Sequence, residues 1–395
     1  MLTDWLFWLF LLVGVPTFWA ISPRHRLPFL GALSFAYLLH LESLSILVLA
    51  AWTVAFYLLV PRIARPGAPR RLLSTIVLSA LAYLAYFKYL PRLSAAMSAE
   101  PLLAQVAVPL GISYYTFKLI HYAIEVSRGN IRAHTFGEFA CYVFLVPIFT
   151  AGPIERFDHF LANREPVWQL QSTAEGLTRI AHGLIKKFVI ANMVLLPAFG
   201  NISNAGVLLE QLPALPTWKV WGFCILTFLY LYLDFSAYSD IAIGASRLFG
   251  LRIMENFNWP IFADNIGVFW KRWHMTLAGW CQSYVYMPTV GLTRNPYVAT
   301  YATFSAIALW HSASIGWLAW GLYHATGISA YGYWNRERRR RKWRGLDRPG
   351  WRWIGIPVTF AFVSAGSSLT SVDAYGNPWD MLRVIAKLAL IDLPA

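Results

Sequence analysis

Charge is scarce in this chain of 395 residues, of which Asp, Glu, Lys and Arg make up only 13%. A soluble domain carries about 25% charged residues, so a water-soluble globule of this size is excluded. Cysteine is scarcer still. Cys141, Cys224 and Cys281 stand in apolar stretches without disulfide or zinc-ligand spacing, so we expect three buried thiols and no metal site. The GxSxG, HExxH, P-loop and GxGxxG signatures are also missing, which excludes the common hydrolase, kinase and dinucleotide-binding sites.

Hydrophobic residues make up 57% of the chain, and long apolar runs separate its basic residues. A bilayer core of about 30 Å takes about 20 helical residues. Runs of about that length are 2–21, 72–90, 218–235, 299–323 and 351–368, and the longer run 27–60 predicts a helical hairpin. We therefore expect an all-α, multi-pass membrane protein with roughly ten or eleven membrane helices, besides interfacial and re-entrant ones. Arg24 and Arg26 follow the first run, which places its N-terminus outside the cell.

Polar or helix-breaking residues interrupt the apolar pattern in three places. Proline and glycine break the hydropathy of residues 101–200, which predicts short, tilted or re-entrant segments there. Residues 155–180 are polar and are expected to form an interfacial or loop stretch. The run RERRRRKWR at 336–344 lies between two apolar runs, which favours a cytoplasmic anchor on anionic lipid headgroups over a nucleic-acid site. A docking surface for an acidic carrier protein is the other interpretation of this run.

Ionisable side chains in apolar surroundings need a partner or a function, because placing one at bilayer depth costs at least about 2.5 kcal/mol. Asp234, Tyr238 and Asp240 follow the apolar run LTFLYLYL, and the first two share a helical face. The simpler interpretation is a helix end whose carboxylates pair with Arg247 or Arg252. We favour it over a catalytic role for either aspartate.

Three histidines lie among apolar and aromatic residues in the second half of the chain. His274 follows Lys271 and Arg272 in a tryptophan-rich stretch typical of the membrane–water boundary, and a purely structural interfacial helix explains it. His311 lies within an apolar stretch, where packing is the commoner role. Yet a dehydrated imidazole stays neutral and can accept a proton from a hydroxyl. His324 falls on another helical face nearer the basic run and is expected at the interface. Channel, transporter and membrane enzyme all remain open.

Five ordered motifs stand between Val108 and Ala325: VPLGISYYTFKLIHYAIEVSRG, VPIFTAGPIERF, the block from YLDFSAYSD to FWKRWHMTL, SYVYMPTVG and ALWHSASIGWLAWGLYHA. Together they resemble the membrane-bound O-acyltransferase family, in particular its bacterial branch of alginate O-acetylation and teichoic-acid D-alanyl transfer (DltB-like) proteins. The first hundred residues match only in being helical and apolar. The resemblance implies a shallow cone of helices around a buried tunnel, where a cytoplasmic thioester donor meets an acceptor from the other side.

The resemblance also implies roles for single residues. His311 falls on the catalytic histidine of the family's Leu-Trp-His motif, and His274 falls on the histidine of its bacterial Arg-Trp-His motif. We assign the general base to His311 and a supporting role to His274. Ser312 stands where glycine commonly follows the catalytic histidine, and residues 281–283 (Cys-Gln-Ser) replace a frequent aromatic-Arg-Asp sequence. The second change puts in doubt any contact made by the missing charges.

The remaining candidates are weaker substrate contacts. Asp234, Tyr238 and Asp240 are candidates for orienting groups, and Ser312 is a further candidate beside the base. Lys271 and Arg272 are candidates for the phosphate of a phosphopantetheine arm, although snorkelling to the interface explains them equally well.

The resemblance implies an O-acyltransferase that moves an acyl group, with acetyl favoured and D-alanyl next, to a hydroxyl of an extracytoplasmic polysaccharide or cell-wall polymer. The donor is expected to be acetyl-CoA or an acyl carrier protein thioester. No bound cofactor and no nucleic-acid partner are expected, whereas membrane lipids and a separate exported acyltransferase partner are. The expected place is the bacterial cytoplasmic (inner) membrane. A transporter of a small solute or lipid-linked sugar is the rival from another class, and a catalytically silent scaffold is a third interpretation.

The chain is expected to divide into four segments. Residues 1–100 would form N-terminal transmembrane helices, 101–335 the catalytic core, 336–350 a basic cytoplasmic loop and 351–395 C-terminal transmembrane helices.

Overall fold

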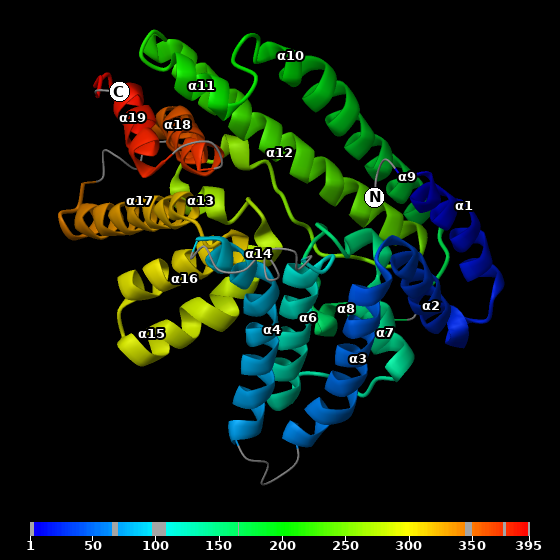
Figure 1. Ribbon diagram of the computed structural model, residues 1–395. Coiled ribbons are helices and arrows are strands. Elements are labelled where there is room, and N and C mark those ends of the chain that lie inside the picture. Colours follow the sequence, from blue (N-terminus) through cyan, green and yellow to red (C-terminus); the bar gives the residue numbers. More distant parts are fainter. Residues whose placement is uncertain are drawn as a thin grey trace. The chain divides into compact units, whose positions relative to one another are not determined.

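Helices account for the architecture of this protein. The computed structural model describes residues 4–64, 70–96, 108–164, 166–343, 350–373 and 377–393. Within these ranges every regular element is a helix (Figure 1), which confirms the all-α class expected from the composition. The chain forms two compact units, Met1–Leu184 with Tyr238–Glu255 and Ile185–Ala237 with Asn256–Ala395. The functional division into four segments stays a prediction.

The first unit contains the N-terminal helices and the end of α12 (Thr217–Leu248). Its elements are α1 (Trp5–Ala20), α2 (Pro23–Leu41), α3 (Ser43–Leu59), η1 (Val60–Ala64), α4 (Arg70–Ala96), α6 (Ile112–Ser127), α7 (Phe136–Phe144), η2 (Val146–Ile148), α8 (Phe157–Ala162) and α9 (Leu170–Leu184). The run 27–60 forms the expected hairpin of α2 and α3. The hairpin turns at Glu42, whose carboxylate accepts a 2.9 Å hydrogen bond from the Leu110 backbone N–H. In Figure 1, α4 and α6 stand side by side.

The second half of the polar segment 155–180 is helical, so the loop alternative is wrong there, and an interfacial position stays a prediction. Helix α9 continues as the π-helical η3 (Ile185–Leu195) and as α10 (Leu196–Ala198). The whole stretch Leu170–Ala198 is long and apolar enough to span a membrane. Low hydropathy concealed this helix because α9 buries a face of mostly small residues: Ser172, Gly176, Ile180 and Gly183. Small residues at such spacing let two helices approach closely in a membrane.

Two glycines allow α9 and α12 (Thr217–Leu248) to cross in contact. A β-carbon added to Gly244 would lie 2.6 Å from the Gly176 carbonyl oxygen and 2.9 Å from Cγ1 of Ile180. A β-carbon added to Gly176 would lie 2.9 Å from the Gly244 carbonyl oxygen. Such distances leave no room for a methyl group, so the crossing requires glycine on both helices.

We expect Gly244→Ala to destabilise the protein by about 1–3 kcal/mol, because the added methyl group overpacks the crossing. Gly222→Ala is the matched control, since Gly222 lies in the same helix and a β-carbon added there would meet no described atom within 4 Å. Removing a glycine from an open helical position stabilises by about 0.5–1 kcal/mol. Thermal unfolding in detergent measures both variants, and equal midpoints would contradict the close crossing.

The second unit holds the rest of the chain. Its elements after α10 are α11 (Ala205–Gln211), the first part of α12, η4 (Pro260–Phe262), α13 (Ile266–Trp270), α14 (Met275–Cys281), η5 (Gln282–Tyr286), α15 (Met287–Thr293), α16 (Pro296–His311), α17 (Ile315–Arg340), α18 (Trp351–Val372) and α19 (Pro378–Leu388). One core cluster joins α11, α12, α18 and α19, and another joins α12, α13, α16, α17 and α18. Cys141 of the first unit and Cys224 and Cys281 of the second are buried free thiols, as expected.

Five helices in the described ranges are long and apolar enough to cross a membrane: Ser43–Ala64, Arg71–Leu90, Leu170–Ala198, Thr217–Leu248 and Trp351–Val372. The shorter α1 is also apolar. The protein is therefore a multi-pass membrane protein, and the number of spans stays a prediction.

The expectation of one continuous span over residues 299–323 is wrong. Helix α16 ends at His311, and α17 begins at Ile315 after the side chain of Ser314 accepts a hydrogen bond from the Trp317 backbone N–H. Ser312 between them has extended backbone. The two helices pack against each other, because Gly321 brings α17 close to the Phe304 carbonyl oxygen. Serine capping thus turns one apolar run into a helical hairpin.

Candidate active site

A small cavity inside the second unit brings three histidines together. Its volume is about 100 Å³, and His274, His311 and His324 all line it. A water molecule takes about 30 Å³ of liquid volume, so the cavity has room for a few heavy atoms. The other lining side chains are mainly aromatic or aliphatic and include Trp270, Trp273, Trp317 and Trp320. The cavity is therefore apolar with a few convergent polar groups, as ligand and active sites are.

His311 is the last residue of α16, at the turn that leads into α17. Its imidazole stacks on Trp317, with ring centroids 4.1 Å apart and an interplanar angle of 11°. A stacked ring directs its in-plane nitrogens away from the ring that covers its face. The break at Ser312 creates this arrangement. The chain reverses there, and Trp317 in the first turn of α17 then lies beside His311 at the end of α16.

His274 is held by a buried amide. It precedes α14 in the left-handed region, at φ 41° and ψ 54°, a conformation that costs energy in a residue with a side chain. Its Nδ1 lies 3.0 Å from Oδ1 of Asn256. The same oxygen accepts a 2.9 Å hydrogen bond from the Thr276 hydroxyl, and the Asn256 backbone oxygen accepts one from the Met275 N–H, also at 2.9 Å. Asn256 therefore fixes both the backbone and the ring of His274.

The chemical form of His274 follows from these contacts. An amide oxygen only accepts, so Nδ1 of His274 carries the proton and donates to Asn256. Its Nε2 is buried and has no hydrogen-bond partner among the described residues. Burial lowers the pKa of His274 to about 3, with no charged partner contributing to the shift, so the ring is neutral at physiological pH. His274 therefore offers an acceptor nitrogen at the cavity.

His324 is fully buried and lines the same cavity as His311, so the expectation that it lies on a different face is wrong. The indole N–H of Trp270 donates to its Nδ1 at 3.3 Å. The expectation failed because it counted 100° per residue from His311 through a continuous helix. Residues 312–314 break that helix, so the directions of the side chains on α17 cannot be counted from His311. Sequence reasoning therefore missed the third histidine, and the serines around the break were the signal that could have revealed it.

The other candidates in the second unit are not among the residues that line the cavity. Asp234 lies in mid-helix, not at a helix end, and pairs with Lys187 of η3. Lys271 is exposed, and the backbone carbonyl of Arg272 accepts a 2.9 Å hydrogen bond from Asn258. Ser312 is buried and caps α16 through its backbone N–H. Roles for these residues in substrate contact stay predictions.

Tyr238 and Asp240 belong to the first unit. The Tyr238 hydroxyl shares a 2.6 Å hydrogen bond with the hydroxyl of Thr150. Asp240 pairs with Nε of Arg179 at 2.5 Å. The expected pairing of the aspartates with Arg247 or Arg252 is therefore wrong, and Arg247 instead pairs with Glu175, more than 70 positions earlier in the chain.

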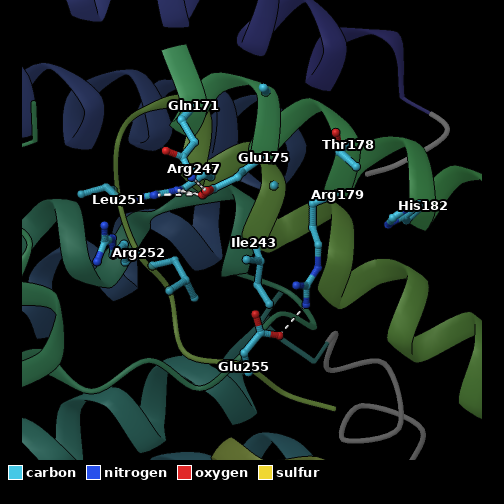
Figure 2. A pocket seen from close by; sticks show the side chains of 13 residues that line it. Gln171, Glu175, Thr178, Arg179, His182, Ile243, Arg247, Leu251, Arg252 and Glu255 are labelled. Atoms are coloured by element: carbon cyan, nitrogen blue, oxygen red, sulfur yellow. Dashed lines mark hydrogen bonds and ion pairs between the residues drawn. The ribbon is translucent and has the colours of Figure 1, made fainter. Parts of the chain in front are cut away.

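These ion pairs border a groove of about 830 Å³ in the first unit (Figure 2). Residues from α9, the end of α12 and the segment 251–255 line it. Figure 2 shows Arg247 facing Glu175 and Arg179 facing Glu255 across the groove. The acidic and basic side chains neutralise each other, so we assign these pairs to the packing of α9 on α12.

Most of this chain is similar in sequence to known proteins. Residues 63–369 match the model of the membrane-bound O-acyltransferase family. A probable alginate O-acetylase AlgI from Pseudomonas aeruginosa is 32% identical over 81% of this chain and 64% of its own length. A teichoic acid D-alanyltransferase from Bacillus subtilis is 29% identical over 65% of this chain and 67% of its own length. A peptidoglycan O-acetyltransferase from Helicobacter pylori is 26% identical over 70% of this chain and 58% of its own length.

The chain spans about half to two thirds of the length of these curated relatives. The family match includes His274, His311 and His324, and it covers far more than half of the 395 residues. The chain belongs to the membrane-bound O-acyltransferase family.

Proposed function

We propose that this protein is an O-acyltransferase that moves an acyl group from a thioester to a hydroxyl of a polysaccharide or cell-wall polymer. The observation that carries the proposal is the cavity in which His274 and His311 meet inside a helical unit of this family. The relatives are named for acyl transfer to alginate, teichoic acid and peptidoglycan. Acetyl is the favoured group, because two of these three relatives are named for acetyl transfer, and D-alanyl is next.

In this proposal His311 is the general base. The acceptor oxygen attacks the thioester carbonyl carbon while the imidazole takes the hydroxyl proton, a C–O bond forms, and the carbonyl electron pair moves onto oxygen. Collapse of this intermediate restores the C=O bond and breaks the C–S bond. The leaving thiolate takes the proton back from His311. The products are an ester and a free thiol, and the base is regenerated.

The size of the cavity supports transfer of a small group. About 100 Å³ accommodates an acetyl group. The thioester would be acetyl-CoA or an acyl carrier protein thioester that approaches through a buried tunnel. The arginines at the end of α17, Arg338, Arg339 and Arg340, mark the cytoplasmic end of that helix in a bacterial inner membrane. A separate exported protein would complete the transfer to the polymer.

Thiol release distinguishes this proposal from its rival. Purified protein in detergent would be given labelled acetyl-CoA, or a D-alanyl carrier-protein thioester, with and without a hydroxyl-bearing oligosaccharide. An acyltransferase releases free thiol and labels the oligosaccharide, and the donor that supports the reaction identifies the acyl group. A transporter of a small solute or lipid-linked sugar leaves the thioester intact. A scaffold also leaves it intact, and would transport no solute.

We expect His274→Ala to lower kcat/KM for the acceptor by about tenfold, a smaller loss than removal of the base causes. The reason is that the Nε2 of His274 accepts a hydrogen bond, so it can hold a second hydroxyl of the acceptor while the reacting hydroxyl gives its proton to His311. Initial rates at varied acceptor concentration measure the effect, and most of it should appear as a higher KM. Wild-type kinetics in this variant would assign His274 to structure alone.

A further inference from the structure

Within the described residues, two ring nitrogens at the cavity stand without a partner. Nε2 of His274 and Nε2 of His324 are both buried, and neither makes a hydrogen bond there. An unsatisfied buried polar atom costs about 1–3 kcal/mol, so such atoms are rare in folded proteins. Two of them at one cavity point to a ligand that satisfies both.

The two nitrogens have opposite chemistry. Asn256 accepts from Nδ1 of His274, which leaves the Nε2 of His274 as an acceptor. For His324 the partner is the Trp270 indole N–H, which can only donate. Nδ1 of His324 must therefore be the accepting nitrogen, and the neutral ring carries its proton on Nε2. Among the described residues, the two histidines that line the cavity thus supply one unpartnered acceptor and one unpartnered donor.

Aromatic side chains surround the ring of His324, and its Nε2 is buried. Trp270 contacts the ring edge-on, with centroids 5.3 Å apart and an interplanar angle of 90°, and Phe362 does so at 5.6 Å and 88°. On α18, a β-carbon added to Gly366 would lie 3.1 Å from this nitrogen. The fold therefore fixes the direction of this N–H before any ligand arrives.

We propose that His324 is a catalytic residue whose Nε2–H donates a hydrogen bond to the carbonyl oxygen of the acyl donor. This inference rests on the proposed acyl transfer. When the acceptor oxygen bonds to the carbonyl carbon, the C=O electron pair moves onto the carbonyl oxygen, and the N–H stabilises that negative charge. When the C–S bond breaks, the pair returns to the C=O bond. His324 keeps its proton throughout, while His311 carries the proton from hydroxyl to thiolate.

A comparison of two amides at position 324 tests this assignment. Glutamine places its side-chain nitrogen near the position of Nε2, whereas asparagine places its nitrogen near that of Nδ1. We expect His324→Asn to lower kcat by about 10²–10³-fold with little change in KM for the donor, because an oxyanion donor acts in the transition state. We expect His324→Gln to keep kcat within about tenfold of wild type. His182→Asn is the matched control, because this histidine is exposed and lies in the first unit.

Rates per folded molecule, from size-exclusion peaks in detergent, separate catalysis from folding. If His324→Asn does not fold, Gly366→Ala provides the second measurement, because its methyl group covers Nε2 while His324 stays intact. A large loss of kcat in that variant supports the assignment, and an unchanged kcat overturns it. Equal kcat values for His324→Asn and wild type also overturn it and leave the proposed acyl transfer standing. Absence of thiol release by wild type, with every donor, removes the proposed function and this role together.

Discussion

Replacing His311 with alanine is expected to lower acyl transfer by about 10²–10⁴-fold, the contribution of a positioned general base. The side chain lines the cavity and ends α16, and it is only partly buried. Its loss therefore removes the base without removing a large part of the core. We expect the variant to accumulate in the membrane at the wild-type level, as measured by blotting of membrane fractions beside the thiol-release assay.

Two further measurements sharpen this prediction. Trp317→Phe keeps an aromatic ring beside the imidazole, so it should retain most of the activity that His311→Ala loses. A base also acts on the chemical step, so the loss should appear in kcat and not in the KM for the thioester. Full activity in His311→Ala would remove the assignment of the general base to His311 and leave the proposed acyl transfer standing.

Replacing Arg179 with methionine is expected to destabilise the protein by about 3 kcal/mol. Arg179 pairs with both Asp240 and Glu255, and the side chain of Asp240 is only 9% exposed. Removal of the cation takes the ion pair with Arg179 from this nearly buried carboxylate, in a helix long and apolar enough to span a membrane. Breaking a buried pair costs about 3–5 kcal/mol, and the lower end applies because the arginine itself is 34% exposed. The midpoint of thermal unfolding in detergent measures the effect.

A second substitution distinguishes the ion pair from a loss of packing. The double variant Arg179→Met with Asp240→Leu removes both charges of this pair, so part of the lost stability should return. Arg340→Met is the surface control, because its side chain is 78% exposed, and we expect a change within about 0.5 kcal/mol. If the double variant is no more stable than Arg179→Met, the loss comes from packing and the charge argument is wrong.

Local properties of the chain were enough to predict the class of the protein and some of its elements. Hydropathy and low charge predicted a helical membrane protein, because the bilayer imposes one rule on every spanning segment. The hairpin of residues 27–60 and the buried thiol of Cys141 followed from the same rule, since each depends on its neighbours in sequence. The motifs around His274 and His311 likewise identified two of the three histidines at the cavity.

Contacts between distant segments were beyond sequence reasoning. The partners of Asp234 and Asp240, which are Lys187 and Arg179, stand 47 and 61 positions away. Which arginine or lysine pairs with each aspartate is decided when α9 and η3 pack against α12. His324 came to the cavity because capping at residues 312–314 broke one apolar run into two helices. Hydropathy averages over such a break, whereas the direction of every later side chain depends on it, so the third histidine became visible only in the folded chain.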